Sequence, residues 1–333
     1  MDMVGTFPLT RLRRLRKEAW CRDLVAESHV TLENLVQPLF VCETPCHDGM
    51  PPGFYTVTCE EMSTFVETHM LAYGLSKLAL FPVVAVDKKD ASGSEAFRQD
   101  NFFLKAMASL KKRFPEITLI LDVALDPFTD HGHDGVVEQG DVANDKTAHM
   151  LAALSCLYAQ AGADVVAPSD MMDGRVGIIR QALDRQGYEG TKILSYAVKY
   201  ASHFYGPFRQ VMKGPSSKDF SKASYQMDVR NVHEAIREAA LDIQEGADFL
   251  MIKPGLLSLD ILAHLKKSTA VPLFAYHVSG EYVMLRTAAE KGFIDYEQGL
   301  WEILSVLRRA GASGIVTYGA SDAARFMQMM AAG

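Results

Sequence analysis

The chain has 333 residues, 48% of them hydrophobic, and a formal net charge of −7 at pH 7. This composition is typical of a globular protein, and no apolar run approaches the roughly 20 residues that a membrane-spanning helix needs. The negative balance argues against a nucleic-acid-binding surface over the whole protein. A single large domain is allowed, because barrels of alternating strands and helices commonly reach this length.

Residues 1–33 precede the first predicted strand and form an N-terminal arm with a short basic helix. The arm carries apolar side chains that it cannot bury by itself: Phe7, Leu9, Leu12, Leu15 and Trp20. We therefore expect the arm to wrap a neighbouring subunit, which makes the protein a homo-oligomer. Two alternatives remain open: the arm folds back under its own barrel, or its basic stretch binds nucleic acid.

The amino terminus lacks the apolar core of a secretory signal, and its Asp2 and Pro8 fit a transit peptide poorly, so we expect a cytoplasmic protein. The cysteines show no C-x-x-C spacing, which indicates neither a disulfide framework nor a zinc ribbon. We interpret the one close pair, Cys42 and Cys46, as two ordinary thiols.

Eight apolar, β-rich segments follow the arm: 35–42, 77–84, 117–123, 163–168, 192–197, 248–253, 271–276 and 313–318. Each is too continuously apolar for a half-exposed antiparallel strand. The segments between them have helical periodicity, as in 149–161 and 232–245, and several end in a glycine turn that suits a helix C-cap. This alternation predicts parallel strands with crossover helices.

Eight such units close naturally into a (β/α)8 TIM barrel, which we assign to residues 34–333. An open, doubly wound sheet is the alternative, but no G-x-G-x-x-G pattern follows the first strand. In a barrel the chemistry lies at the carboxyl ends of the strands. Those positions are polar: Asp122, Ser169, Lys199, Lys253, Ser279 and Tyr318.

Two of these strand-end residues, Lys199 and Lys253, are lysines, and we expect both to project into one barrel mouth. Apolar surroundings or a second cation lower the pKa of a lysine, and its neutral amine can then attack a carbonyl. A single such lysine more simply reaches solvent or pairs with an aspartate. Two amines at one mouth favour Schiff-base chemistry on two carbonyl groups.

Five motifs then place the chain beside a known family: APSDMMDGR (167–175), SYAVKYASHFYGPFR (195–209), YQMD (225–228), MIKPG (251–255) and YHVSGEY (276–282). With them the chain resembles the porphobilinogen synthase family, also called 5-aminolaevulinate dehydratase, over essentially its whole length. The resemblance implies a lyase of tetrapyrrole (haem) biosynthesis that joins two 5-aminolaevulinate molecules into porphobilinogen with loss of two waters.

The resemblance also implies the catalytic groups. Lys253 matches the lysine that binds the propionate-side substrate as a Schiff base, and Lys199 matches its partner for the acetate-side substrate. Asp122 and Ser169 look like polar groups around the substrate amino end and the two lysines.

Further substrate contacts follow from the same resemblance. Arg209 and Lys222 match the cations that hold the acetate-side carboxylate, and both lie in a lid at about 206–226. Lys222 stands where arginine is common in the family, so bidentate geometry is lost there. The remaining substrate-binding positions are Phe208, Gln226, Tyr276, Ser279 and Tyr318, of which Ser279 and Tyr318 match the hydroxyl pair on the propionate-side carboxylate.

The loop from Asp122 to Gly135 bears on the metal. The zinc-using branch of the family has three cysteines where this chain has Ala124, Asp126 and Asp134. Aspartate oxygens favour hard cations, so the loop resembles the zinc-independent, magnesium-responsive branch and no catalytic zinc is expected. Asp126 and Asp134 either hold magnesium or a monovalent cation, or act without metal by stabilising an ammonium group.

Three further residues of this loop have a simpler interpretation. His131 and His133 form an H-x-H pair without a third soft ligand, which favours a structural or acid–base role. Asp130 is expected to be a solvated turn residue.

A second, allosteric magnesium site is implied by the resemblance at Glu238, and so is a homo-octamer. From the residues alone, an ion pair within the helix or on the surface explains Glu238 equally well, since Arg237 flanks it. Octamer, hexamer and dimer all remain open. Two rival functions also stay open, a class I aldolase-like lyase with one Schiff-base lysine and a catalytically silent scaffold, although the retained lysine pair weighs against both.

Overall fold

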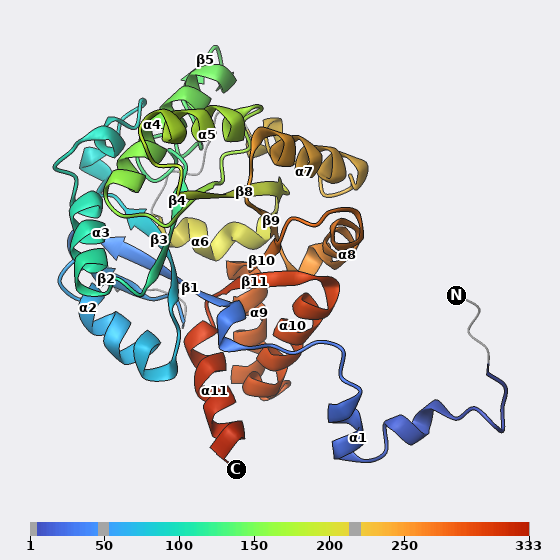
Figure 1. Ribbon diagram of the computed structural model, residues 1–333. Helices are drawn as coiled ribbons and strands as arrows, with labels where there is room; N and C mark the ends of the chain where they lie inside the picture. Colours follow the sequence, from blue (N-terminus) through green and yellow to red (C-terminus); the bar gives the residue numbers. More distant parts are fainter. Residues whose placement is uncertain (1–4, 46–52, 213–220, 333) are drawn as a thin grey trace.

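The computed structural model describes residues 5–45, 53–212 and 221–332, and it is a closed barrel of parallel strands (Figure 1). All eight predicted strand segments form barrel strands, so the predicted (β/α)8 fold is confirmed. The barrel strands are β1 (Leu35–Cys42), β3 (Lys77–Val83), β4 (Thr118–Val123), β7 (Val165–Pro168), β8 (Lys192–Lys199), β9 (Phe249–Lys253), β10 (Leu273–His277) and β11 (Ala312–Thr317).

Pairing between the last and first strands closes the barrel. Leu35 and Val36 of β1 pair with Ile315 and Val316 of β11, and every other barrel contact is also parallel. The second half of β1 pairs instead with β2 (Thr56–Thr58), a short strand that lies outside the ring. A small hairpin, β5 (Val137–Glu138) and β6 (Asp141–Val142), rises from the loop after β4.

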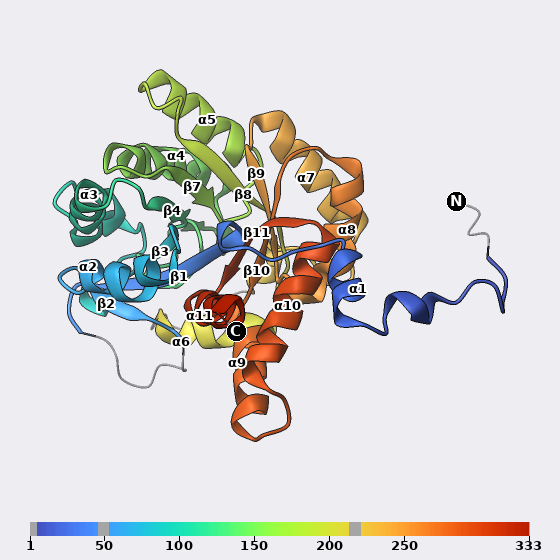
Figure 2. The ribbon, with the colours of Figure 1, turned by 60° about the horizontal axis from the view of Figure 1, so that its bottom comes forward.

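Helices surround the strands, as Figures 1 and 2 show. Within the described residues, no helix is both long enough and apolar enough to span a membrane. The α-helices are α1 (Ala19–Leu24), α2 (Met62–Phe65), α3 (Phe102–Arg113), α4 (Asn144–Gln160), α5 (Arg175–Arg185), α6 (Gly206–Val211), α7 (His233–Glu245), α8 (Leu259–Ser268), α9 (Ser279–Glu290), α10 (Tyr296–Ala310) and α11 (Ala320–Ala332).

Two apolar cores divide the strand side chains. One fills the barrel and includes Phe40, Phe81 and Tyr276. The other lies between the strands and the helices and includes Leu39 and Leu80. Because side chains alternate along a strand, strands covered on both faces need apolar residues at nearly every position, and this is why the predicted strands read as continuous apolar runs.

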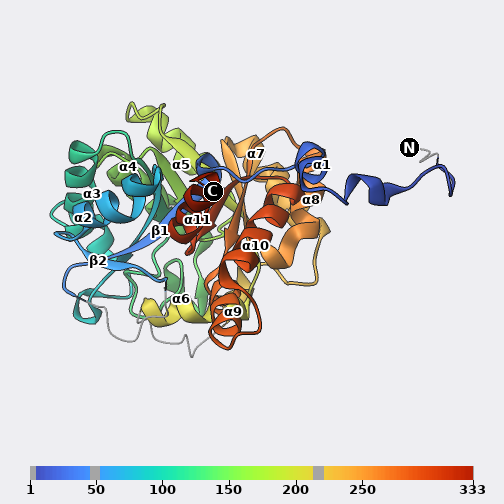
Figure 3. The same ribbon diagram turned by 90° about the horizontal axis from the view of Figure 1, so that it is seen from below.

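The N-terminal arm extends away from the barrel (Figure 3). It contains a short 3-10 helix, Leu12–Leu15, followed by α1. Its apolar side chains are exposed, with Phe7 at 77%, Leu9 at 80% and Trp20 at 67% of their surface. The alternative that the arm folds back under its own barrel is therefore wrong for the described residues, which leave this apolar surface uncovered.

One cysteine interpretation is corrected. Cys42, at the end of β1, is disulfide-bonded and is not an ordinary thiol. Cys46 lies outside the described residues. The spacing of cysteines along the sequence does not reveal such a bond, because the proximity of two thiols depends on the path of the chain after the strand.

Candidate active site

The two lysines are neighbours at the carboxyl ends of adjacent strands. Lys199 of β8 and Lys253 of β9 are register partners, so their Cα atoms lie directly opposite each other across the parallel pair. Both side chains are buried. The structure thus brings together the two lysines that the strand-end pattern singled out, since parallel strands bring their carboxyl ends to one mouth.

Lys253 lies in an aromatic cage. Its Nζ lies 4.6 Å from the ring centre of Tyr276, 5.0 Å from Tyr205, 5.2 Å from Tyr196 and 5.4 Å from Phe208. Burial, reinforced by the charge of Lys199, lowers the pKa of Lys253 to about 7. A substantial fraction of this amine is therefore neutral near pH 7, as nucleophilic attack on a carbonyl requires.

Lys199 has polar surroundings instead. Its Nζ donates to the backbone carbonyl of Ser169, and Asp134 Oδ1 lies 3.5 Å away. The two amines thus face different environments, one aromatic and one anionic. Groups placed in contrasting environments can take different roles in one reaction.

Asp122 lies near the end of β4, close enough to both lysines for their charges to act on it. Burial, and then the charge of Asp126, raise the pKa of Asp122 to about 7, while Lys253, Lys199 and a hydrogen bond with Ser169 act in the opposite direction. A carboxyl group with a pKa near neutrality can both donate and accept a proton, which suits general acid–base work beside an amine.

The aspartate loop after β4 is neutralised by a cation of the same chain. Lys222 Nζ lies 3.2 Å from Asp134 Oδ2 and 3.6 Å from Asp126 Oδ2. Burial opposes ionisation of Asp134, but Lys199 and Lys222 outweigh it and hold the pKa of Asp134 below its ordinary value. Burial raises the pKa of Asp126 despite Lys222. In this structure Lys222 thus pairs with the two aspartates, and its predicted contact with a substrate carboxylate stays a prediction.

Tyr225 anchors this loop, and sequence reasoning missed it. Its hydroxyl accepts a hydrogen bond from the backbone N–H of Asp134 at 3.3 Å and lies 3.1 Å from His133 Nδ1. Burial, and then Asp134, raise the pKa of Tyr225, so the hydroxyl stays neutral. The sequence feature that could have identified Tyr225 is its place in the YQMD motif.

The histidines of the loop take part in its internal contacts. His131 Nδ1 accepts from the backbone N–H of His133 at 3.1 Å, and burial lowers the pKa of His133 to about 4. Asp130 is exposed, as expected for a turn residue. Among the described residues, no group of three or more His, Cys, Asp or Glu side chains is arranged to hold a metal ion.

A second polar corner lies at the ends of β10 and β11. The hydroxyls of Tyr276 and Tyr318 are 3.3 Å apart. Ser279 Oγ accepts from the backbone N–H of Phe208 at 3.2 Å and donates to the carbonyl of Phe204 at 3.1 Å. The serine thereby links the start of α9 to α6, the helix that begins the predicted lid.

The ring of Phe54, just before β2, stacks on Tyr318 with ring centres 4.1 Å apart. Nothing in the local sequence around Phe54 pointed to this corner of the site.

Part of the predicted lid can be placed. Arg209 on α6 is exposed and donates from Nη2 to the carbonyl of Ser202 at 3.5 Å. Gln226 is buried, and its Oε1 has no hydrogen-bond partner among the described residues. Residues 213–220 of the predicted 206–226 lid lie outside the described residues.

Glu238 on α7 lies in a buried ionic cluster. Its carboxylate is 3.3 Å from the guanidinium of Arg175, a residue of α5, and not paired with the neighbouring Arg237. Burial raises the pKa of Glu238 to about 7. Arg175 is fully buried and also contacts Asp242 and Asp170, and sequence reasoning assigned it no role.

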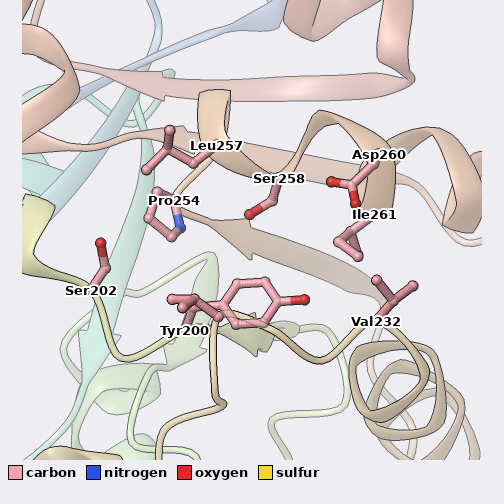
Figure 4. Close-up of a pocket in the computed structure, with 9 residues that line it drawn as sticks. Tyr200, Ser202, Val232, Pro254, Leu257, Ser258, Asp260 and Ile261 are labelled. Atoms are coloured by element: carbon pink, nitrogen blue, oxygen red, sulfur yellow. The ribbon is translucent and has the colours of Figure 1, made fainter.

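A pocket lies next to the chain segments that follow β8 and β9 (Figure 4). Two of its walls are Tyr200 and Pro254, the residues that follow Lys199 and Lys253 in the chain. Further lining residues include Ser202 after β8, Val232 just before α7, Leu257 just before α8 and Asp260 within α8. The pocket contains neither lysine side chain and is distinct from the barrel mouth.

A closed parallel barrel that buries two facing lysines, one with a pKa near neutrality, has the arrangement of an enzyme that forms Schiff bases. The model of the delta-aminolevulinic acid dehydratase family matches residues 9–326. The chain belongs to this family, and the family prediction is confirmed.

Relatives agree over nearly the whole chain. The delta-aminolevulinic acid dehydratase of Bradyrhizobium diazoefficiens is 43% identical over 94% of this chain and 90% of its own length. That of Chlamydia pneumoniae is 43% identical over 93% of this chain and 94% of its own. A crystal structure of delta-aminolevulinic acid dehydratase (porphobilinogen synthase) from Toxoplasma gondii, in complex with the reaction product porphobilinogen, is 43% identical, covers 97% of this chain and 93% of its own, and superposes with a TM-score of 0.94.

Proposed function

We propose that this chain is a porphobilinogen synthase that condenses two molecules of 5-aminolaevulinate into porphobilinogen with loss of two waters. Family membership supports the reaction, and the facing Lys199 and Lys253 support its route. One amine for each substrate ketone accounts for an asymmetric condensation in which both carbonyl carbons are held in place.

In the proposed route, each lysine amine adds to a substrate ketone and expels one water as the imine forms. Carbon–carbon bond formation at one imine carbon and carbon–nitrogen bond formation at the other then displace the two lysines, which regenerates both amines. The net loss is two waters. Lys253, with its pKa near 7, is the amine suited to attack on the propionate-side substrate, and Asp122 is placed to move protons beside it.

The substrate carboxylates are assigned to two groups of residues. Ser279 and Tyr318 receive the propionate-side carboxylate, beside Tyr276 and Phe208. Arg209 and Lys222 receive the acetate-side carboxylate when the lid closes, with Gln226 on the lid side and Ser169 near the substrate amine. The buried, unpartnered Oε1 of Gln226 supports a substrate donor at that point, because a buried acceptor is normally satisfied.

We assign the chain to the zinc-independent, magnesium-responsive branch. Ala124 is buried and offers no side-chain ligand, which does not fit a thiolate zinc site. Asp126 and Asp134 supply the oxygen ligands that magnesium or a monovalent cation prefers. Lys222 occupies the place of that cation in this structure, so a metal ion would bind there after Lys222 moves to the substrate.

We also propose an allosteric magnesium at Glu238, a homo-octamer and a cytoplasmic location. The Glu238 side chain keeps 17% of its surface exposed, which lets a hydrated cation reach it. Exposed apolar residues on the arm support a subunit contact.

The deciding experiment is an assay of purified protein with 5-aminolaevulinate, in which Ehrlich's reagent detects the pyrrole and borohydride traps imines. The expected result is pyrrole formation with a substrate adduct at Lys253. Aldol cleavage without pyrrole would instead select an aldolase-like lyase, and neither activity nor adduct would select a silent scaffold. Restoring chelated enzyme separately with magnesium, zinc and potassium tests the metal, and full recovery with zinc alone would reject the assigned branch.

A further inference from the structure

Strand β8 carries one residue too many for a regular ladder with β9. The ladder pairs Ser195 with Leu250, and its next pair is Val198 with Ile252. Three steps along β8 therefore face two steps along β9, which is the geometry of a β-bulge. The irregularity ends one residue before Lys199.

The bulge decides which side chain faces the barrel interior. Tyr196 belongs to the interior core, whereas Ala197 and Val198 both belong to the outer core between strands and helices. Two successive outward residues reset the alternation, so Lys199 points inward beside Lys253. In a regular strand after Tyr196, Val198 would point inward and Lys199 outward, because a slip by one residue exchanges the two faces.

A buried arginine holds the bulged segment from outside the barrel. Arg175, at the start of α5, donates from Nη2 to Ser195 Oγ at 3.1 Å and to the carbonyl of Tyr196 at 3.3 Å. Its Nη1 donates to Asp242 Oδ1 on α7 at 3.1 Å, and the other oxygen of Asp242 accepts from Ser195 Oγ. The ion pair between Arg175 and Asp242 thus holds the Ser195 side chain and the Tyr196 carbonyl of β8 against α5 and α7.

The same guanidinium also reaches the end of the neighbouring strand. Arg175 Nε lies 3.6 Å from Asp170, the residue after Ser169. The carbonyl of Ser169 is the acceptor of Lys199 Nζ. Arg175 therefore contacts both segments that set the position of Lys199: the bulge that precedes it, and, through the Asp170 side chain, the loop that receives its amine.

We propose that Arg175, together with Asp242, is a positioning residue that holds the β8 bulge and thereby makes Lys199, and not Val198, face Lys253. The expected effect on imine formation at Lys199 rests on the proposed function, whereas the expected orientation of Lys199 toward Lys253 does not. Two experiments separate them.

The first experiment needs no activity. Residues paired across adjacent strands lie within the Cα separation that a disulfide bridges, so Lys199→Cys with Lys253→Cys is expected to cross-link on mild oxidation. Adding Arg175→Met is expected to weaken this cross-link and to produce one in the Val198→Cys, Lys253→Cys pair, with both mapped by mass spectrometry of peptides.

Because Arg175→Met leaves buried acids unpaired, Ser195→Ala serves as a second variant that keeps the charges and removes only one contact at the bulge. Like Arg175→Met, it is expected to weaken the 199–253 cross-link and to favour the 198–253 cross-link. An undiminished 199–253 cross-link in both backgrounds would overturn the inference.

The second experiment follows imine formation in the otherwise native chain. In Arg175→Lys and Ser195→Ala, borohydride trapping of 5-aminolaevulinate is expected to fall about tenfold at Lys199 and to stay near wild type at Lys253, because misplacing a reacting group lowers its rate steeply. Ser155→Ala is the matched control, since it removes a buried hydroxyl bonded to the carbonyl of Leu151 at 2.8 Å.

The outcomes separate the two hypotheses. Equal losses at both lysines would indicate general destabilisation and reject the positioning role. No pyrrole and no adduct in the unsubstituted protein would reject the proposed function, while the cross-linking result would still decide the geometry.

Discussion

At the residue scale, the chemistry depends on how charges are shared at the barrel mouth. Lys253 and Asp122 both have pKa values near 7, the one lowered and the other raised mainly by burial. Sequence reasoning identified both residues but not which lysine lies among aromatic rings.

Imine formation at Lys253 is expected to increase as the pH rises through about 7, because only the neutral amine attacks. Well below that pH, the rate should fall about tenfold per unit of pH. Lys199→Met removes the cation that, together with burial, lowers the pKa of Lys253. The pKa of Lys253 should therefore increase in this variant, and the rise in imine formation should occur at higher pH. The measurement is the borohydride-trapping rate at Lys253 against pH. An unchanged profile in Lys199→Met would contradict the charge coupling.

Lys222→Met is expected to destabilise the fold by roughly 2 kcal/mol at pH 7, because it leaves Asp134 and Asp126 with less counter-charge. The pKa of Asp134 lies below its ordinary value in the fold, so its ionised form stabilises the protein above the unfolded pKa, and this contribution is lost as the pH falls through the folded value. The difference in the free energy of unfolding between the wild type and Lys222→Met should therefore become smaller in acid. Thermal unfolding against pH measures it.

The same variant tests the cation site. Added magnesium should restore part of the lost stability of Lys222→Met if Asp126 and Asp134 accept a metal ion. Lys146→Met is the control, because its pair with Glu138 is solvent-exposed and worth at most about 1 kcal/mol. A full stability loss that magnesium does not change would reject metal binding at these carboxylates.

At the element scale, strands and loops differ in how far sequence predicts them. Strand β9 was visible as an apolar run ending at Lys253, because burial on both faces forces that composition. The bulge in β8 was not visible, since a bulge is defined by the partner strand and not by the strand itself. The aspartates of the loop after β4 could be identified from the sequence. Their partners Lys222 and Tyr225 could not, because they come from a segment far along the chain.

Tyr225→Phe is expected to loosen the aspartate loop. It removes the hydroxyl that accepts from the backbone N–H of Asp134, and a buried donor left without an acceptor costs about 1–3 kcal/mol. Faster amide exchange across residues 131–136, with unchanged exchange in β9, is the expected result. Tyr73→Phe, a half-exposed tyrosine, is the control. Uniform destabilisation of the whole barrel would contradict a local anchoring role.

At the scale of the whole molecule, the barrel is complete in itself and the arm is not. The barrel buries its strands on both sides. The arm exposes large apolar side chains, and Figure 3 shows that its backbone extends away from the barrel. A surface of this kind normally marks an association site, and we propose a second copy of the chain as the partner.

Deletion of residues 1–25 is expected to lower the oligomeric state while the barrel stays folded. The arm supplies little to the barrel core, and among its described residues 5–25 only Cys21 is buried. Sedimentation velocity gives the mass, and circular dichroism with thermal unfolding checks the fold. Leu9→Ser with Leu12→Ser is the milder variant and should weaken the same assembly. An unchanged mass in both would show that the arm is not the subunit contact.

The sequence by itself determined the barrel, the two lysines and the family, because each leaves a local trace: apolar runs, strand-end polarity and long motifs. Tertiary structure alone decided that Lys199 faces Lys253, that Lys222 neutralises the aspartate loop, and that Cys42 is disulfide-bonded. These are contacts between segments distant in the chain or set by its path. Composition and spacing record which groups are available, whereas only packing sets which of them meet and what their pKa values become.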